Sequence, residues 1–284
     1  MIPGIPTPRA VRVLHGAYVA AFFVYLFAPL AVVAALAFND SLFPALPWEG
    51  FTLDWFLASG PRRVGLLHDR ELLRGMATSV QVALCVSLSS VAVGTTNAFL
   101  FEQEAFPFKG ALYTLALTPL VIPGVILGIS ILVFSSTIAN ALEAAAGIEV
   151  ESLRPSLVLV VLGQFSFITT LTTLVLTARL RKFDRGLEEA ARTLGATRPA
   201  AIVTITLRFL RPAAVAAGAL AFLMSFENFN TTLFLVGSDA TLPITMFVSL
   251  RDGSTPVINA VSVVLMVASA TTGLAGLAAG SRRR

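Results

Sequence analysis

Long apolar stretches, separated by short polar or charged segments, run through almost the whole chain. A helix that crosses a bilayer needs about 20 consecutive, mostly apolar residues, because every backbone polar group must be paired inside the membrane. Six stretches are long enough, and they predict an all-α polytopic membrane protein with six transmembrane helices. The predicted spans are Leu14–Phe38, Met76–Phe101, Ala111–Ile138, Ser156–Ala178, Pro212–Phe234 and Val257–Ala279.

The composition agrees with this pattern. Hydrophobic residues make up 56% of the 284 residues and charged residues 13%, whereas a soluble domain carries about 25% charged residues. The first apolar run lacks a small-residue cleavage site, so we expect it to stay as an anchor. A single cysteine, Cys85, excludes a disulfide framework, and His15 and His68 lie too far apart to predict a zinc site.

Basic residues gather at both ends of the chain and in the segment between the fourth and fifth predicted spans. Since cytoplasmic loops hold most Lys and Arg, all three regions are predicted to be cytoplasmic, which six spans allow. The residues are Arg9, Arg12, Arg179, Arg181, Lys182, Arg185, Arg192, Arg198, Arg208, Arg211, Arg282, Arg283 and Arg284. The excess of basic over acidic residues is thus explained by the orientation of the chain in the membrane. No basic patch with interleaved aromatic residues predicts nucleic-acid binding.

The cytoplasmic segment 184–207 has the pattern of two short helices. After Asp184, a suitable N-cap, an apolar stripe recurs at helical spacing. That stripe consists of Leu187, Ala190, Ala191 and Leu194. On the other face, Arg185 with Glu189 and Glu188 with Arg192 are spaced to pair at i, i+4. Gly195 suits a helix end, and Thr197 with Pro199 suits a second helix start. Periodicity alone leaves open a helix on the membrane surface or a docking element.

The run EAARTLGATRPAAIVTITL, residues 189–207, resembles the EAA loop of binding-protein-dependent ABC transporter permeases. The resemblance implies a type I ABC importer permease in which this helix couples to the ATPase. The coupling residues would be Glu188, Glu189, Ala190, Ala191, Leu194 and Gly195. Arg208 stands where the family usually has proline, so Pro212 would set the bend instead.

Other segments resemble the spermidine/putrescine, or polyamine, branch of these permeases. They are ALPWEGFTLDWFLAS, ATSVQVAL, PLVIPGVILGISIL and LPITMFVSLRDGSTPVINAVSVVLMV. The resemblance implies a bacterial inner-membrane location, a second homologous permease chain, an ATPase dimer and an extracytoplasmic solute-binding protein. Related branches that carry ferric iron or phosphonates share this layout, and a secondary transporter or membrane scaffold remains as a further alternative.

The chain itself has no sequence motif of an enzyme. A phosphate-binding GxxxxGK[ST] loop needs a Gly-Lys pair, whereas Lys109 follows Phe108 and Lys182 follows Arg181. No Gly-x-Ser-x-Gly elbow is present either. We therefore expect a transport subunit that binds no cofactor, with ATP and Mg²⁺ held by the partner ATPase.

An acidic residue interrupts the fifth apolar stretch. In SFENFN, residues 225–230, an acid in mid-helix costs about 2.5–3.5 kcal/mol on insertion scales, so Glu227 is a candidate for the solute pathway. Polyamine-type permeases often carry an acid at the matching place. Phe226 and Phe229 are candidates for cation–π contacts, with Asn228 between them, although packing is the common role of such rings. The alternative places Glu227 at the outer interface, hydrated or hydrogen-bonded to Asn228 and Asn230.

The predicted outer loops are long. Asn39–Arg74 and Gly237–Pro256 are candidate landing surfaces for a solute-binding protein, and Trp48 and Trp55 are placed as in an interfacial aromatic belt. In the third predicted span, two prolines at 119 and 123 predict a kink, or a break that serves a gate.

Overall fold

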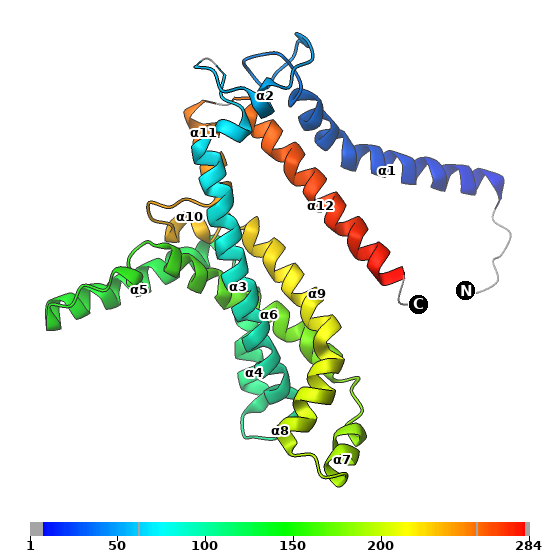
Figure 1. Ribbon diagram of the computed structural model, residues 1–284, viewed down its shortest axis with the longest axis vertical. Coiled ribbons are helices and arrows are strands. Elements are labelled where there is room, and N and C mark those ends of the chain that lie inside the picture. Colours follow the sequence, from blue (N-terminus) through cyan, green and yellow to red (C-terminus); the bar gives the residue numbers. More distant parts are fainter. Residues whose placement is uncertain (1–7, 62, 254, 282–284) are drawn as a thin grey trace. The chain divides into compact units, whose positions relative to one another are not determined.

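The computed structural model describes residues 8–61, 63–253 and 255–281, with side chains described for all of these except 272–281 (Figure 1). The described residues form helices and two isolated bridges, Asn39 with Phe51 and Ser59 with Val64, and no strand. The all-α fold class is therefore confirmed. Arg282, Arg283 and Arg284, which supported the predicted orientation, lie outside the described residues.

The chain divides into two compact units, one of residues 1–73 with 248–284 and one of residues 74–247. Helices α3 (Arg70–Gln103) and α11 (Leu242–Asp252) run across the boundaries between them. The first unit contains α1 (Arg9–Leu36), α2 (Asp54–Leu57), η1 (Leu66–His68) and α12 (Val257–Ser281). The second contains α4 (Lys109–Leu117), η2 (Thr118–Leu120), α5 (Gly124–Ala146), η3 (Glu151–Leu153), α6 (Leu157–Leu180), α7 (Gly186–Thr193), α8 (Arg198–Ala201), the π-helix η4 (Ile202–Thr206), α9 (Leu207–Phe226) and α10 (Thr232–Leu235).

In the first unit, α1 contacts α12, and α2 and η1 pack against α12. The buried apolar side chains lie just after α1, in α2 and η1, and at the starts of α3 and α12. Helix α1 itself buries none of its side chains within this unit.

A hydrogen-bonded network organises the loop after α1. The Asn39 side chain accepts from the backbone N of Glu49 at 2.8 Å, and its backbone O accepts from Trp55 Nε1 at 2.9 Å. Arg63 pairs with Asp40 and with Asp54, and the hydrogen bond to Asp40 raises the pKa of Arg63. Trp55 is therefore a buried anchor rather than the interfacial residue predicted from sequence, whereas Trp48 is half exposed.

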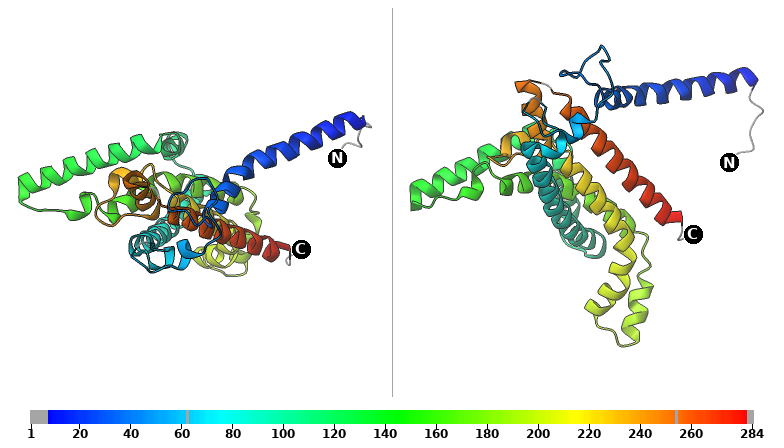
Figure 2. Two further views of the ribbon diagram at one scale, coloured as in Figure 1. Left: turned by 90° about the horizontal axis from the view of Figure 1, so that it is seen from above. Right: turned by 45° about the horizontal axis from the view of Figure 1, so that its top comes forward.

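In the second unit, α6 is the central helix and lies along α9 (Figures 1 and 2). One apolar cluster joins α3, α6, α9 and α10, and a second joins α3, α6 and α9 near the loop that follows α6. The members of the second cluster are Ala98, Leu176, Leu180, Phe183 and Leu210. The segment that follows α6 therefore begins at residues packed tightly against α3 and α9.

Five helical segments are long and apolar enough to cross a membrane: Arg9–Leu36, Arg70–Gln103, Gly124–Ala146, Leu157–Leu180 and Arg198–Phe226. This is the pattern of a multi-pass membrane protein. The sixth predicted span begins with α12 at Val257, whose side chains are described only to Thr271. The count of six spans stays a prediction.

The third predicted span, Ala111–Ile138, is not one helix. Helix α4 ends at Leu117, η2 contains Pro119, and Pro123 is the N-cap of α5. Because each proline lacks an N–H and its ring clashes with the carbonyl four residues earlier, two prolines this close end the helix rather than bend it. The membrane-length helix starts at Gly124 and runs on to Ala146.

The fifth predicted span, Pro212–Phe234, also differs from the structure. The helical segment begins at Arg198, continues through η4 and ends at Phe226. It ends there because the Asn228 side chain accepts from the backbone N of Thr232 at 3.3 Å, which starts α10 as a separate turn. Glu227 thus lies at a helix end and not in mid-helix.

The contact between α3 and α6 depends on a glycine. A Cβ added at Gly94 would lie 2.4 Å from Oγ1 of Thr172 and 3.0 Å from the backbone N of Thr173. We expect Gly94→Ala to destabilise the protein by about 1–3 kcal/mol, the usual cost of overpacking. Thermal unfolding in detergent measures this, with Gly110→Ala as the control because a Cβ there meets no atom within 4 Å. Equal melting temperatures for the two variants would contradict the close helix contact.

Candidate functional site

The first candidate site is the break between α9 and α10. Glu227 is the C-cap of α9 and is exposed, and its carboxylate has no hydrogen bond or ion pair within the described part of the chain. The helix dipole gives this end of α9 a partial negative charge, to which the carboxylate adds. An irregular backbone, a free acid and a helix C-terminus therefore coincide at one point of an apolar region, and such a point attracts cations.

The side chains beside Glu227 are held by other partners. Asn228 Oδ1 accepts from Thr232 Oγ1 at 2.9 Å, and the described residues contain no bond from Asn228 or Asn230 to Glu227. Phe226 stacks on Phe222 with ring centroids 6.0 Å apart. Phe229 packs against Phe247 with ring centroids 5.0 Å apart. Both rings are partly exposed, so they pack within the chain and keep some open surface.

The second candidate site is the loop at 184–207, which the structure builds as α7, a turn and α8 (Figures 1 and 2). Gly195 has φ +96°, a left-handed conformation that suits glycine, and it ends the α7 turn. Thr197 caps α8 as predicted, accepting from the backbone N of Ala200 at 3.4 Å. Helix α7 begins at Gly186, one residue later than a cap at Asp184 predicts, and Asp184 accepts from the backbone N of Gly186 at 2.9 Å.

The ion pairs predicted within α7 do not form. Glu188 instead accepts a hydrogen bond from the buried hydroxyl of Thr206 in η4, and Arg185 donates to the backbone O of Glu102. The sequence pattern missed these contacts because the partners lie far along the chain. Helix α7 is therefore tied to the segment that leads into α9.

The end of α3 and the residues after it hold the same loop. Arg181 pairs with Glu102 at 2.7 Å, and Arg198 pairs with Glu104 at 2.7 Å. The hydrogen bond to Glu102 raises the pKa of Arg181. Both arginines are largely exposed, so the two pairs add little to the stability of the fold, and their role is to fix where the loop lies.

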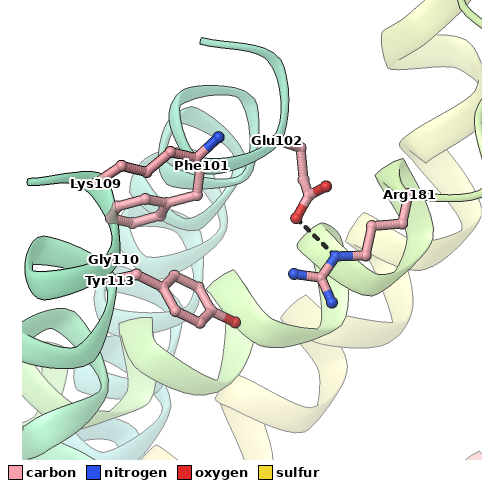
Figure 3. Close-up of a pocket in the computed structure, with 6 residues that line it drawn as sticks. All are labelled: Phe101, Glu102, Lys109, Gly110, Tyr113 and Arg181. Carbon is pink, nitrogen blue, oxygen red and sulfur yellow. Dashed lines mark hydrogen bonds and ion pairs between the residues drawn. The ribbon is translucent and has the colours of Figure 1, made fainter. Parts of the chain in front are cut away.

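A cavity of about 300 Å³ lies beside this attachment (Figure 3). Figure 3 shows the Glu102–Arg181 pair on one side and Lys109 and Tyr113 on the other. The Lys109 ammonium donates to the backbone O of Glu104 at 2.9 Å. The Tyr113 ring lies edge-on to the Phe101 ring, with centroids 5.1 Å apart. The charged groups here are engaged in structural contacts and do not form a set suited to acid–base chemistry.

The outer face of α7 is not covered by the described residues of the second unit. Leu194 is 89% exposed and Leu187 52% exposed, and both belong to the predicted apolar stripe. Glu189 lies on a shallow cleft of about 550 Å³ with Arg192 and Arg198. Exposed leucines beside charges of both signs form a surface suited to a protein partner.

One buried polar residue was missed by the sequence analysis. Gln164 lies in the middle of α6, is 0% exposed and hydrogen-bonds to both sides of the break at Glu227. A glutamine inside an apolar run is the signal that identifies it. The described residues contain no group of three His, Cys, Asp or Glu side chains arranged to hold a metal ion.

No family model matches the chain. The putrescine transport system permease protein PotI of Escherichia coli strain K12 is 29% identical over 253 residues, 88% of this chain and 85% of PotI. The spermidine/putrescine permease protein PotC of the same strain is 24% identical over 259 residues, 91% of this chain and 90% of PotC. The molybdate/tungstate permease protein WtpB of Thermococcus kodakarensis is 30% identical over 145 residues, 51% of this chain and 53% of WtpB.

Solved structures agree on the fold. A bacterial ABC transporter that imports the acidic polysaccharide alginate superposes with a TM-score of 0.73 at 18% identity, covering 96% of this chain and 95% of that one. A structure of a bacterial alginate ABC transporter in complex with its pentasaccharide-bound periplasmic protein gives a TM-score of 0.71 at 17% identity, with coverage of 91% and 90%. The chain is a homologue of polyamine ABC transporter permeases over most of its length, with the fold of an ABC importer permease.

Proposed function

We propose that this chain is the permease subunit of an ATP-driven importer that carries a small organic polycation, such as putrescine or spermidine, across the cytoplasmic membrane. The observation that carries this proposal is the free carboxylate of Glu227 at the C-terminal end of α9. The similarity to PotI and PotC over most of both chains supports it.

The exposure of Glu227 bears on where it acts. An ionised carboxylate facing hydrocarbon is costly, so Glu227 faces water or another subunit in the assembled protein. A path between this chain and a second, homologous permease satisfies that requirement. Phe226 and Phe229 would add ring faces to which ammonium groups are attracted, and Asn228 fixes the backbone between them.

A second candidate is an anionic solute. WtpB is named as a molybdate/tungstate permease protein and is similar to this chain over half of its length. The transporter of alginate, an acidic polysaccharide, shares the fold. A carboxylate at the negative end of a helix repels anions, so the chemistry of the break favours a cation. Ferric iron, also a cation, and phosphonate remain outcomes of the test below.

The partners follow from the same proposal. A pair of ATPase chains holds ATP and Mg²⁺ and binds the exposed face of α7, the coupling helix, through Leu194, Glu189 and the cleft beside them. Ala190, Ala191 and Gly195 shape that surface. An extracytoplasmic solute-binding protein delivers the solute, a partner suggested by the alginate transporter solved in complex with a pentasaccharide-bound periplasmic protein. With both termini cytoplasmic, the loop after α1 is on the outer side.

Alternating access then has a mechanical route. ATP binding draws the two ATPases together, and α7 follows the groove in which it lies. The bond from Thr206 to Glu188 passes this movement to η4 and α9, and Arg181 and Arg198 pass it to the end of α3. A π-helical turn is a common site of adjustment within a helix, which suits η4 to this position.

The test is uptake into proteoliposomes that hold the chain co-expressed with its ATPase, second permease and binding protein. Labelled putrescine, spermidine, ferric complex, phosphonate and molybdate are compared, with ATP inside. We expect ATP-dependent uptake of a polyamine only. ATP-dependent uptake of molybdate or phosphonate would replace the polycation with an anion. Uptake driven by an ion gradient without ATP would identify a secondary transporter, and absence of all uptake from an intact complex would favour a scaffold.

A further inference from the structure

Gln164 is a fully buried polar side chain within an apolar helix. It lies on α6 at 0% exposure, with Val160, Ile168 and other apolar residues of the α6 core around it. A primary amide placed in such surroundings without partners is costly. A glutamine is therefore retained here only if its bonds to neighbouring elements offset that cost.

Gln164 hydrogen-bonds on both sides of the break between α9 and α10. Its Oε1 accepts from the hydroxyl of Ser225, in the last turn of α9. Its Nε2 donates to Oγ1 of Thr232, the first residue of α10, at 2.8 Å. Thr232 Oγ1 in turn donates to Asn228 Oδ1 at 2.9 Å. One side chain thus sets the distance between the two ends of the irregular segment.

Close packing holds α10 against α5 and α6. A Cβ added at Gly128 of α5 would lie 2.8 Å from the backbone O of Thr231, and one added at Gly163 of α6 would lie 2.3 Å from Cδ1 of Leu235. The Thr231 hydroxyl donates to the backbone O of Gly124 at 3.3 Å. Because the far side of the break is held in this way, Gln164 fixes the near side, at Ser225 and Glu227, relative to it.

We propose that Gln164 is a positioning residue for the solute pathway: by joining Ser225 to Thr232 it fixes the backbone of the break and so the place of the Glu227 carboxylate. This inference rests on the proposed function insofar as Glu227 meets solute. The positioning itself is a property of the fold, and it is measured without any solute.

The solute-free measurement is the reaction of a cysteine at position 227 with a cationic and an anionic methanethiosulfonate. The complex carries Cys85→Ala and Glu227→Cys, since Cys85 is an exposed free thiol. Gln164→Leu is added to it, and Gln81→Leu serves as the matched control because Gln81 is exposed and its side chain has no hydrogen-bond partner within the described residues. We expect Gln164→Leu to change the labelling rate about tenfold or more, and Gln81→Leu to leave it unchanged.

A second pair of variants keeps the test decisive if Gln164→Leu fails to fold. Thr232→Val removes the hydroxyl that Gln164 binds, while Thr232→Ser keeps it. With native Glu227, we expect Gln164→Leu and Thr232→Val to raise the half-saturating solute concentration about tenfold, with a smaller effect on the maximal uptake rate. We expect Thr232→Ser to keep the wild-type half-saturating concentration.

Wild-type labelling at 227 in Gln164→Leu, or in Thr232→Val where the first variant does not fold, would overturn the proposal. A changed labelling rate in a complex that transports no polyamine would support the positioning role and count against the solute assignment alone. The failures of the two proposals are therefore distinguished.

Discussion

Replacing Glu227 with glutamine is expected to lower polyamine uptake about 10- to 100-fold, because a hydrogen bond to a charged group contributes about 1.5–3 kcal/mol and each 1.4 kcal/mol is tenfold. Glutamine has nearly the same shape, so the α9 end and its aromatic neighbours stay in place. The substitution removes only the charge. Since the Glu227 carboxylate has no partner among the described residues, no contact within the described chain is lost.

The measurement is initial uptake of labelled putrescine and spermidine into ATP-loaded proteoliposomes, with basal ATP hydrolysis and binding-protein docking measured on the same samples. Glu149→Gln is the matched control, because Glu149 is an exposed acid in the connection between α5 and η3, also without a described partner. Equal uptake by the two variants would remove Glu227 from the pathway and leave the transporter proposal standing.

Replacing Leu194 with glutamate is expected to weaken binding of the ATPase at least about 100-fold. Leu194 is the C-cap of α7 and is 89% exposed, so the substitution leaves the fold of the chain unchanged. In the proposed complex this side chain is buried in the ATPase groove. A buried, unpaired charge costs about 3–5 kcal/mol, which exceeds the loss expected from Leu194→Ala.

Affinity of the purified permease pair for the ATPase, measured in nanodiscs, tests this expectation. Leu46→Glu is the control, since Leu46 is 79% exposed in the loop after α1 and its substitution adds the same charge. Binding of the ATPase to Leu194→Glu with the affinity of the Leu46→Glu control would show that α7 is not the docking surface.

Local patterns in the sequence predicted the parts of this protein that depend on neighbours in sequence. The apolar stretches predicted the long helices, and the cap at Thr197 and the turn at Gly195 were found from residue type and spacing alone. These features are local because a helix start or end is decided by the hydrogen bonds of four or five residues. The candidate loop was located in the same way.

Competition between hydropathy and local hydrogen bonding explains the errors in helix bounds. Hydropathy stays high across Pro119, and after the polar residues around Glu227 the apolar run resumes to Phe234, whereas the backbone needs of Pro123 and the capping side chain of Asn228 end the helices earlier. An average of hydropathy over a window of residues takes no account of missing proline N–H groups or of capping side chains.

Contacts between distant segments were not predictable from one sequence. Glu188 has Arg192 at the right helical spacing, yet it bonds to Thr206, and Arg181 and Arg198 find partners in Glu102 and Glu104. An exposed ion pair within one helix contributes little stability, so each of these side chains binds a better-placed group from another segment instead. The role of Gln164 was missed for the same reason: the glutamine stands out within an apolar run, but its partners lie 61 and 68 residues away.

Helix α1 buries none of its side chains within the described part of its unit. A helix of this kind adds little to the cohesion of its subunit, so mutation of its residues is judged by whatever surrounds it. We expect its sequence to drift among related organisms with the thickness and lipids of their membranes and with the neighbouring subunit. The residues packed between α6 and α9 have no such freedom, so we expect substitutions to accumulate more slowly there than in α1.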